Sequence, residues 1–387
     1  MSLSGADLAG GRGGDVEVAA LSTILMHGPV SRTDLAARLS LSPSTMTRAV
    51  KPLLDRGLVH ETADAVEGPG RPSRPLVGTR GSGRYVGAKL TGDEVFAVAT
   101  DMMANVISVE RRELASHQPD AVADAVADVV RHLGAGDGLD GIGVSLGGSA
   151  MDGRTVDRAP FLGWREVPLA EMLETRVEAP VVIDNDLAAL TAAEHWFGLG
   201  RGLSDFAVVT IGAGTGLGLV HHDEVVRTRD LGLGPAGHIP LEPFGPRCAL
   251  GHRGCAEAVV TVPAMETQAR VALQRDVRFE EVLDLARSGD PACADIVRTA
   301  ARATGRLIAL VANLAMVEVV VLGGEGLALL DVAEPDMRAQ IAIDRDPEAH
   351  DLDIRIDRSG FPLWARGAAT IAIQSSLRRL IQAPASP

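Results

Sequence analysis

A run of short hydroxyl side chains followed by cations predicts a surface that reads DNA. These side chains fall within one expected helix, and they are Ser44, Thr45, Thr47, Arg48 and Lys51. Hydroxyl groups and a guanidinium hydrogen-bond the edges of bases in a major groove, whereas a lysine further along the helix suits a phosphate. We therefore predict that this helix is the recognition helix of a DNA-binding segment.

Three short helices are expected to position these side chains. The first covers residues 16–27, the second begins after Ser31, and the third begins after Ser42 with Pro43 at its first position. Serine before a helix and proline at its start are helix-start signals, so the pattern predicts a helix-turn-helix. Pro52 lacks a backbone N–H and predicts a kink in the third helix. Small three-helix units also serve as dimerisation modules, which is the alternative interpretation.

A Pro/Gly-rich stretch, residues 68–75, contains two arginines and no acidic residue, and it follows an expected strand at residues 58–60. Because prolines hold the backbone extended, Arg71 and Arg74 are predicted to lie along a minor groove or a row of phosphates, as in the wing of a winged helix. The alternative is a linker between domains. We expect the winged helix-turn-helix domain to span residues 1–80.

Composition and charge limit what the rest of the chain does. The 387 residues are 46% hydrophobic and 23% charged, as in globular domains, and the length suits about three units. The net charge of −14 divides into +1 for residues 1–80 (nine basic, eight acidic) and −15 for residues 81–387 (28 basic, 43 acidic). The acidic body would repel DNA, so DNA contact is assigned to the first domain. Without a membrane-length apolar run or a signal-type stretch, a soluble, cytoplasmic protein is expected.

Alternating strand-like and helical runs from Tyr85 onward predict an α/β body with two similar halves. Two glycine-rich loops follow apolar runs, at Gly212–Gly216 and at Gly323–Gly326. Glycine lets backbone N–H groups approach a phosphate closely. One such loop is a weak signal, but two in one α/β body suggest an ancestral nucleotide cleft between two lobes. We expect the first lobe over residues 81–200 and the second over residues 201–387.

Taken together, the motifs resemble the ROK family (repressors, open reading frames and sugar kinases). In chain order they are the helix-turn-helix, VIDND at 182–186, IGAGTGLG at 211–218, Gly237-His238, CALGHRGCAE at 248–257, VLGGEG at 321–326 and Gly367-Ala368-Ala369. The cysteine-glycine signature is the most specific of them. The resemblance implies a two-lobed, actin-like ATPase fold with a sugar site in the cleft. For members with a front DNA-binding domain it implies a sugar-responsive repressor.

The phosphate-binding part of the family pattern is absent. Kinases of the family carry Asp-x-Gly-Gly-Thr at the first hairpin, whereas residues 86–94 here read VGAKLTGDE. Lys89 stands where an Asp associated with the metal is expected. Asp93 and Glu94 would place negative charge beside a triphosphate, and like charges ~4 Å apart repel each other by several kcal/mol. Asp186 matches the kinase catalytic base, but a base without a positioned γ-phosphate transfers nothing. We therefore expect no catalytic residue and no bound ATP.

The sugar site that the resemblance implies is partly kept. Two polar positions of the family pattern are replaced here, by Phe161 and by Pro235. The positions that still match are Asn185, Asp186, His238 and Glu257. Carboxylates and amides bind vicinal hydroxyls through paired hydrogen bonds, so these residues are predicted to contact a sugar, and Phe161 indicates that the ligand need not be a plain hexose. The alternative is that residues 184–186 and Glu257 only cap helices.

A structural zinc is the cofactor that the resemblance implies. The three cysteines of the chain are too few for a disulfide framework, and Cys248 and Cys255 lie close enough together to suggest a metal. In the family one His and three Cys hold the zinc, and the matching ligands here are His238, Cys248 and Cys255. Leu250 replaces the remaining Cys, and three ligands do not close a tetrahedral structural site, so His252 is a candidate for the fourth. The alternative is a loop that has lost its metal and keeps two buried thiols.

These observations predict a transcriptional regulator, a repressor of carbohydrate-related genes that acts as a homodimer or homotetramer and has no membrane partner. A winged helix would bind double-stranded operator DNA, and a catalytically inactive sugar-kinase-like body would dimerise and sense a sugar or a sugar derivative. The rival from another class is an active ATP-dependent hexose kinase with an accessory DNA-binding domain. A third interpretation is a regulator that has lost its ligand.

Overall fold

The computed structural model describes residues 13–62, 74–133 and 138–382, and it confirms an α/β protein. The chain divides into two compact units, one of residues 1–203 and 362–387 and one of residues 204–361. Among the helices of the described segments, none combines the length and the apolar character that crossing a bilayer requires.

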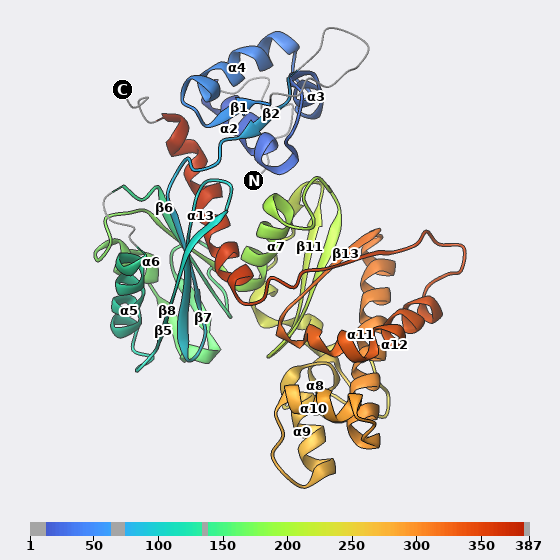
Figure 1. The fold of residues 1–387 in the computed structure, drawn as a ribbon. Coiled ribbons are helices and arrows are strands. Elements are labelled where there is room, and N and C mark those ends of the chain that lie inside the picture. The colour runs from blue at the N-terminus through green and yellow to red at the C-terminus, as the bar shows by residue number, and fades with distance from the viewer. Residues whose placement is uncertain (1–12, 63–73, 134–137, 383–387) are drawn as a thin grey trace. The chain divides into compact units, whose positions relative to one another are not determined.

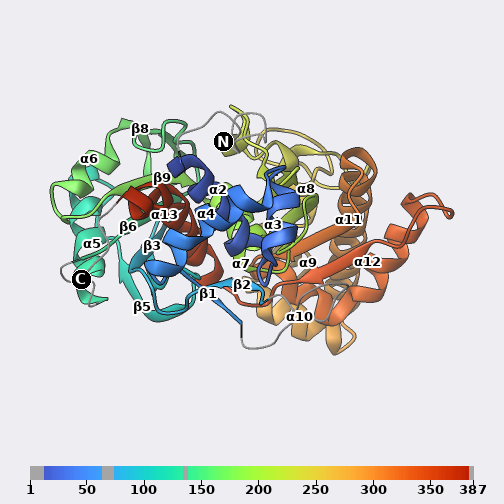
Figure 2. The same cartoon turned by 90° about the horizontal axis from the view of Figure 1, so that it is seen from above.

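The front of the first unit consists of three helices and a two-stranded hairpin (Figure 2). The elements are α2 (Gly13–His27), α3 (Arg32–Arg38), α4 (Pro43–Asp55), β1 (Val59–Glu61) and β2 (Leu76–Gly78). The hydroxyls of Ser31 and Ser42 each accept a backbone N–H bond of 3.1 Å from the first turn of α3 and of α4, which confirms both predicted helix starts. The helix α4 contains Pro52 in its interior and runs on to Asp55. The strands β1 and β2 pair antiparallel, as in a winged helix.

A five-stranded sheet forms the body of the first unit. Its order is β5-β4-β3-β6-β9, and the strands are β3 (Tyr85–Leu90), β4 (Glu94–Thr100), β5 (Val106–Glu113), β6 (Gly141–Leu146) and β9 (Val181–Asn185). Figure 1 shows helices on both faces: α5 (Pro119–His132) and α6 (Leu169–Glu174) on one, α7 (Asp186–Phe197) and α13 (Pro362–Gln382) on the other. A small hairpin consists of β7 (Val156–Ala159) and β8 (Trp164–Val167), and the turn η1 (Pro160–Leu162) lies between its strands. Because helices cover both faces, every residue of β3 and β6 is buried.

The helix α13 packs directly on this sheet, so its residues belong to the first unit. A side chain at Gly87 or at Gly143 would meet a carbonyl oxygen of α13 at 2.0 or 1.7 Å, so only glycine allows the helix to lie this close. A Cβ atom at Gly367 of α13 would lie 2.8 Å from the backbone of α7, so this helix pair is also closely packed. The prediction that the second lobe runs to residue 387 is therefore wrong at its C-terminal end, because small residues of α13 match glycines of the first sheet.

The second unit repeats the same sheet topology, which confirms the two similar halves. Its order is β12-β11-β10-β13-β14, and the strands are β10 (Phe206–Ile211), β11 (Thr215–His221), β12 (Glu224–Val225), β13 (Val319–Gly323) and β14 (Asp353–Ile356). Its helices are α8 (Ala256–Val259), α9 (Val262–Leu273), α10 (Phe279–Arg287), α11 (Pro291–Ala315) and α12 (Leu330–Asp344), and its short turns are η2 (Leu231–Leu233), η3 (Pro235–His238) and η4 (Glu325–Leu329). In each sheet the central strand pairs antiparallel on one side and parallel on the other.

Candidate functional site

The helix α4 presents a polar face to solvent. Its buried side, with Met46, Val50 and Leu53, packs into the core of the front segment. The exposed side chains are those of Ser44, Thr47, Arg48 and Lys51, while Thr45 is half-buried. The Thr45 hydroxyl lies 2.9 Å from the Ser42 hydroxyl at the start of the helix. Four of the five predicted contact residues on α4 are therefore open to a DNA partner.

The predicted wing is described only in part. Arg74, just before β2, is exposed. Arg71 lies outside the described residues, as does most of the Pro/Gly-rich stretch. Val59 pairs antiparallel with Gly78, and Glu61 with Leu76, in the strands on either side of the predicted wing.

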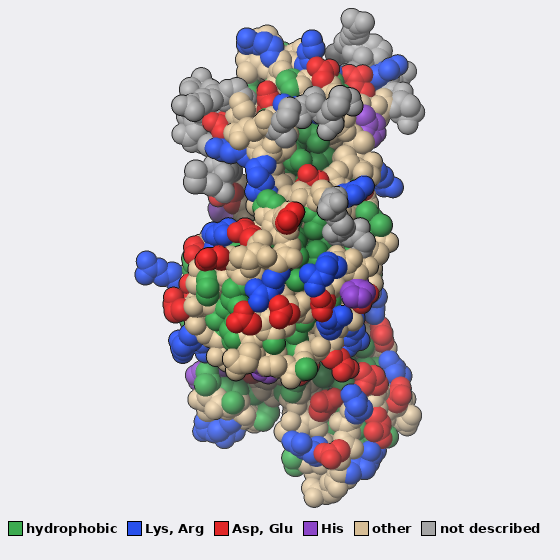
Figure 3. All heavy atoms as spheres, turned by 90° about the vertical axis from the view of Figure 1, so that its left-hand side faces the viewer, with side chains coloured by type: hydrophobic (Ala, Val, Ile, Leu, Met, Phe, Trp, Pro, Cys, Tyr) green, Lys and Arg blue, Asp and Glu red, His purple; other side chains and the backbone are tan. Residues whose placement is uncertain are grey.

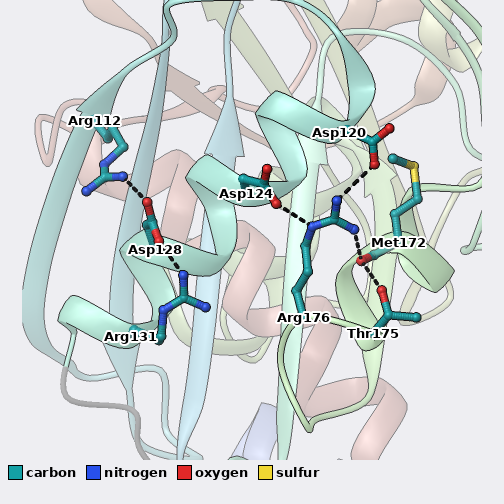
Figure 4. A network of polar contacts seen from close by, with 8 residues as sticks. All are labelled: Arg112, Asp120, Asp124, Asp128, Arg131, Met172, Thr175 and Arg176. Carbon is teal, nitrogen blue, oxygen red and sulfur yellow. Dashed lines mark hydrogen bonds and ion pairs between the residues drawn. The ribbon is translucent and has the colours of Figure 1, made fainter.

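The body of the first unit offers no comparable basic surface on the face that Figure 3 shows, where cationic and acidic side chains are interspersed. Figure 4 shows three arginines, Arg112, Arg131 and Arg176, that are paired with carboxylates of α5. Arg176 bonds Asp124 at 2.6 Å and Asp120 at 2.9 Å. Asp128 pairs with both Arg131 and Arg112. The hydrogen bonds from Arg131 and then Arg112 lower the pKa of the Asp128 carboxyl. Cations neutralised in this way do not attract phosphates.

A buried ion pair joins two positions that the family resemblance assigns to the kinase site, those of a metal-associated Asp and of a catalytic base. Lys89, at the centre of the first sheet, pairs with the Oδ2 atom of Asp186 at the start of α7. The Lys89 side chain is 9% exposed and that of Asp186 is 19% exposed. The Lys89 Nζ also lies 5.1 Å from the centre of the Trp364 ring on α13, within reach of a cation–π contact. In the sequence, Lys89 differs from the family pattern and Asp186 matches it, but the pairing of the two residues was not predicted.

The acidic residues of the β3–β4 turn differ in their surroundings. Asp93 is exposed, whereas the carboxylate of Glu94 forms an ion pair with Arg111 on the neighbouring strand β5. Only Asp93 therefore carries a carboxylate without an ion pair in the described part of this turn.

Asn185 caps α7, as the alternative interpretation had it. Its Oδ1 accepts from the backbone N–H groups of Leu187 and Ala188 at 3.0 and 3.1 Å. Its Nδ2 donates to the carbonyl of Gly148 at 2.9 Å and to Asp186 at 3.3 Å. An amide offers two acceptor sites and two donors, so the side chain is fully used within the protein. Asn185 thus positions Asp186 rather than offering a free group of its own.

Phe161 lies beside the Asp186 carboxylate. Its side chain is 69% exposed, although an aromatic ring is ordinarily buried. A Cβ atom at Gly147 would lie 3.2 Å from the ring of Phe161 and 3.6 Å from Asp186 Oδ2, so ring and carboxylate both border the same glycine. A ligand that reaches Asp186 would meet an apolar surface next to it.

The first glycine-rich loop of the second unit is occupied by a carboxylate of the chain itself. This loop joins β10 to β11, and its Ala213 N–H donates to Glu325 Oε1 at 2.6 Å. A Cβ atom at Gly212 would lie 2.2 Å from the same oxygen, so glycine is what makes room for the carboxylate. The Ala213 N–H is therefore already bonded within the protein, to a carboxylate. The sequence did not predict this contact.

Glu257 faces the glycines around it rather than capping a helix. It lies in the first turn of α8, and its Oε2 is 3.2 Å from the Cβ position of Gly237 and 3.9 Å from that of Gly214. Burial raises the pKa of Glu257, against the opposing effect of His238. At the end of the glycine-rich loop, where β11 begins, the buried Thr215 hydroxyl has no hydrogen-bond partner among the described residues. These groups form a polar set that a hydroxylated ligand would satisfy.

Two histidines and two cysteines converge next to this set. One ligand atom each from His238, Cys248, His252 and Cys255 lies within 4.8 Å of all the others. The Cys248 Sγ is 3.9 Å from His238 Nδ1, and the two imidazole rings are 4.9 Å apart at their centres. Ligand atoms around a tetrahedral zinc lie about 3.3–3.8 Å apart, given zinc–ligand distances of ~2.0–2.3 Å. The donor set therefore fits zinc after small shifts.

The loop geometry brings His252, rather than Leu250, to the cluster. Gly251 turns the chain at φ +86° and donates to the carbonyl of Cys248 at 2.9 Å, and Cys248 N–H donates to the carbonyl of His252 at 2.9 Å. This tight turn carries His252 to the ligands and leaves Leu250 69% exposed. Burial opposes ionisation of Cys248, but hydrogen bonds from the Leu250 backbone and the Cys255 thiol lower its pKa overall, whereas burial raises the pKa of Cys255.

Comparison with known proteins agrees with this architecture. Residues 85–375 match the ROK family, and residues 15–66 match the MarR family. The DNA-binding transcriptional repressor Mlc of Escherichia coli K12 is 28% identical over 325 residues, which cover 80% of each chain.

Two solved structures extend the comparison. A ROK family transcriptional regulator, a homolog of the E. coli MLC protein, covers 96% of this chain and 100% of its own, with a TM-score of 0.79 and 24% identity. A ROK family glucokinase from Streptomyces griseus, in complex with glucose and AMPPNP, covers 75% of this chain and 99% of its own, with a TM-score of 0.64 and 25% identity. The regulator thus shares more of the fold than the glucokinase does. The chain belongs to the ROK family and carries a MarR-like segment at its front.

Proposed function

We propose that this chain is a DNA-binding transcriptional repressor of carbohydrate-related genes, and that its ROK body senses an effector instead of phosphorylating one. The observation that carries the proposal is the exposed polar face of α4, with Arg48 and Lys51, on a MarR-like segment joined to a ROK body. The similarity to Mlc, a DNA-binding transcriptional repressor, supports it. Acting on chromosomal DNA requires that the chain work in the cytoplasm.

In this proposal α4 enters the major groove of operator DNA. Ser44, Thr47 and Arg48 reach base edges, with Thr45 holding the helix start in place. Lys51 contacts a phosphate, and Arg71 and Arg74 of the wing follow the minor groove or the backbone. One half-site contact of this size gives weak, salt-sensitive binding, so a homodimer reading two half-sites is expected, and a homotetramer is its natural extension.

Phosphoryl transfer is not part of the proposed function. The ammonium of Lys89 neutralises the carboxylate that would act as the base, and Glu325 places a negative charge on the loop that would meet a phosphate. Transfer requires a positioned γ-phosphate and an available base, and both positions are engaged by the chain's own groups. No catalytic residue is therefore assigned, and ATP is not expected as a cofactor.

The proposed effector is a sugar or a sugar derivative. Asp186, His238 and Glu257 are the groups assigned to its hydroxyls, and Asn185 supports Asp186 from within the protein. The exposed ring of Phe161 beside Asp186 favours a ligand with an apolar substituent over a plain hexose. A structural zinc held by His238, Cys248, His252 and Cys255 would fix the loop that carries Glu257. A zinc ion bound through one ring nitrogen of His238 would leave the other nitrogen available to orient a ligand.

Selection of bound duplexes from a random DNA pool, repeated with candidate sugars, tests the proposal. Enrichment of one palindromic sequence that a sugar releases is the expected result, whereas failure to enrich any sequence would refute DNA-binding regulation. A coupled ATP-hydrolysis assay over a panel of hexoses addresses the rival kinase. Turnover above background on any of them would contradict the assignment of Lys89 and Glu325. A thermal-shift screen of the same sugars separates a sensing regulator from one without a ligand.

A further inference from the structure

A second group of metal-ligating side chains lies in the second unit, outside the cysteine loop. Asp205 immediately precedes β10, His221 ends β11, and His222 begins the turn to β12. One ligand atom from each of the three lies within 4.8 Å of the others. None of these residues belongs to the ROK motifs in the sequence or to the sites described above.

The turn after β11 brings the two histidines together. His221 pairs with Glu224, so His222 and Asp223 are the two central residues of a hairpin turn, with φ of 51° and 60°. Asn and Gly usually occupy such positions, because other side chains are strained at positive φ. Consecutive side chains of an extended strand point to opposite faces. Here the left-handed backbone at His222 places its ring centre 4.0 Å from that of His221.

Asp205 orients this pair. Its Oδ1 lies 2.7 Å from His221 Nδ1 and accepts from the His222 backbone N–H at 3.2 Å, while its Oδ2 accepts from the Ser204 hydroxyl at 2.7 Å. A divalent ion bound by His221 Nδ1 and Asp205 Oδ1 would replace the proton that these two atoms share in the hydrogen bond. The side chains of His221 and Asp205 are 66% and 39% exposed, so an ion reaches them from solvent.

We propose that Asp205, His221 and His222 form a second metal site, which takes a divalent ion of intermediate softness such as zinc or nickel. Imidazole nitrogens favour zinc, copper and nickel, whereas calcium and magnesium prefer all-oxygen surroundings. Three protein groups leave at least one coordination position for water, unlike the closed set of four around Cys248. A metal-binding role for the imidazole would explain why a histidine occupies this strained turn position.

Cobalt separates this site from the cysteine loop. We would saturate the full-length chain with one equivalent of zinc and then titrate Co²⁺ at neutral pH, following absorbance and heat. A further equivalent of Co²⁺ that binds without a thiolate-to-cobalt charge-transfer band is the expected result. If the cysteine loop does not bind zinc, the band appears with the first cobalt, and the two sites remain distinguishable.

Two variants and one matched control complete the experiment. His222→Asn keeps a residue that tolerates positive φ, and His221→Gln keeps the strand; each is expected to weaken the band-free site by about tenfold or more. Asp223→Asn alters the adjacent turn position without removing a ligand and is expected to change affinity by no more than about twofold. Circular dichroism establishes that all three variants fold. Absence of a band-free equivalent in the unaltered chain overturns the proposal, and so does unchanged affinity in both histidine variants.

Discussion

Lys89 and Asp186 come from a strand and a helix that are 97 residues apart in the chain, and they form an ion pair that is almost enclosed by protein. A kinase of this family would have an Asp in place of Lys89 and a free carboxylate at the position of Asp186. Here one substitution supplies a cation that holds the carboxylate, and Trp364 covers the ammonium from α13. The ion pair is thus part of the packing between a strand and two helices.

Removing the cation alone should destabilise the chain. We expect Lys89→Met to lower the free energy of unfolding by about 2–4 kcal/mol, because it leaves an enclosed carboxylate without its partner. The double variant with Asp186→Asn removes both charges and should regain at least half of that loss. Urea denaturation measures both, and a double variant as unstable as the single one would show that the pair is not the cause.

The two exposed cations of α4 should differ in what they contribute to DNA binding. Arg48→Ala is expected to cost about 1–3 kcal/mol on the selected operator and to relax sequence preference, because a base contact is lost. Lys51→Ala should weaken all duplexes alike and reduce the slope of log K against log salt by about one. Fluorescence anisotropy at several salt concentrations measures both. Equal losses on operator and random DNA for Arg48→Ala would count against a base contact.

Glu325 should keep anions away from the glycine-rich loop. We expect Glu325→Gln to tighten binding of inorganic phosphate by about tenfold at low ionic strength, since the charge at the Ala213 N–H is removed. Glu318→Gln is the matched control, because it makes the same change at the opposite end of β13, on an exposed side chain. Calorimetry measures both. Equal phosphate affinity in the unaltered chain and Glu325→Gln would refute the idea, and hexose turnover should stay absent in either case.

His252 should complete the zinc site. We expect about one zinc per chain by elemental analysis, and His252→Ala should weaken zinc binding by about tenfold or more, as three ligands do not close a structural site. His252→Cys places a thiolate at the same position and should retain zinc binding. Zinc affinity that His252→Ala leaves unchanged would assign the fourth position elsewhere.

Arg56 ties the recognition helix to α13. At the end of α4 its guanidinium donates to the carbonyl of Leu380 at 3.1 Å and also contacts that of Ile381. We expect Arg56→Met to keep operator affinity within about threefold but to lose most of the response to effector, because coupling needs an element that both sites bias. Arg378→Met removes the more exposed α13 ion pair with Asp15 and is the control. A full response in Arg56→Met would place the coupling outside this contact.

The sequence predicted well wherever the cause lies within a few residues. Ser31 and Ser42 cap their helices through hydrogen bonds to residues only three positions further along the chain. The strands around the glycine-rich loops follow from local periodicity. It did not predict contacts closed by folding, such as Glu325 with Ala213, 112 residues apart, or Lys89 with Asp186. The packing of α13 on the first sheet was also not predicted, because small residues indicate close approach but not the element that approaches. The pair His221 and His222 was missed because strand alternation separates neighbours, whereas the left-handed turn brings them together.

The helix α13 also completes the interior of the DNA-binding segment. Ala372, Ile373 and Leu377 lie in one buried cluster with Leu21, Ile24 and Met46 of the front helices. A fragment cut near residue 80 would lose that wall and expose apolar side chains to water. Exchanging operator specificity between regulators of this design therefore requires grafting the front helices together with a matching carboxyl-terminal helix, since neither half of that shared interior is complete without the other.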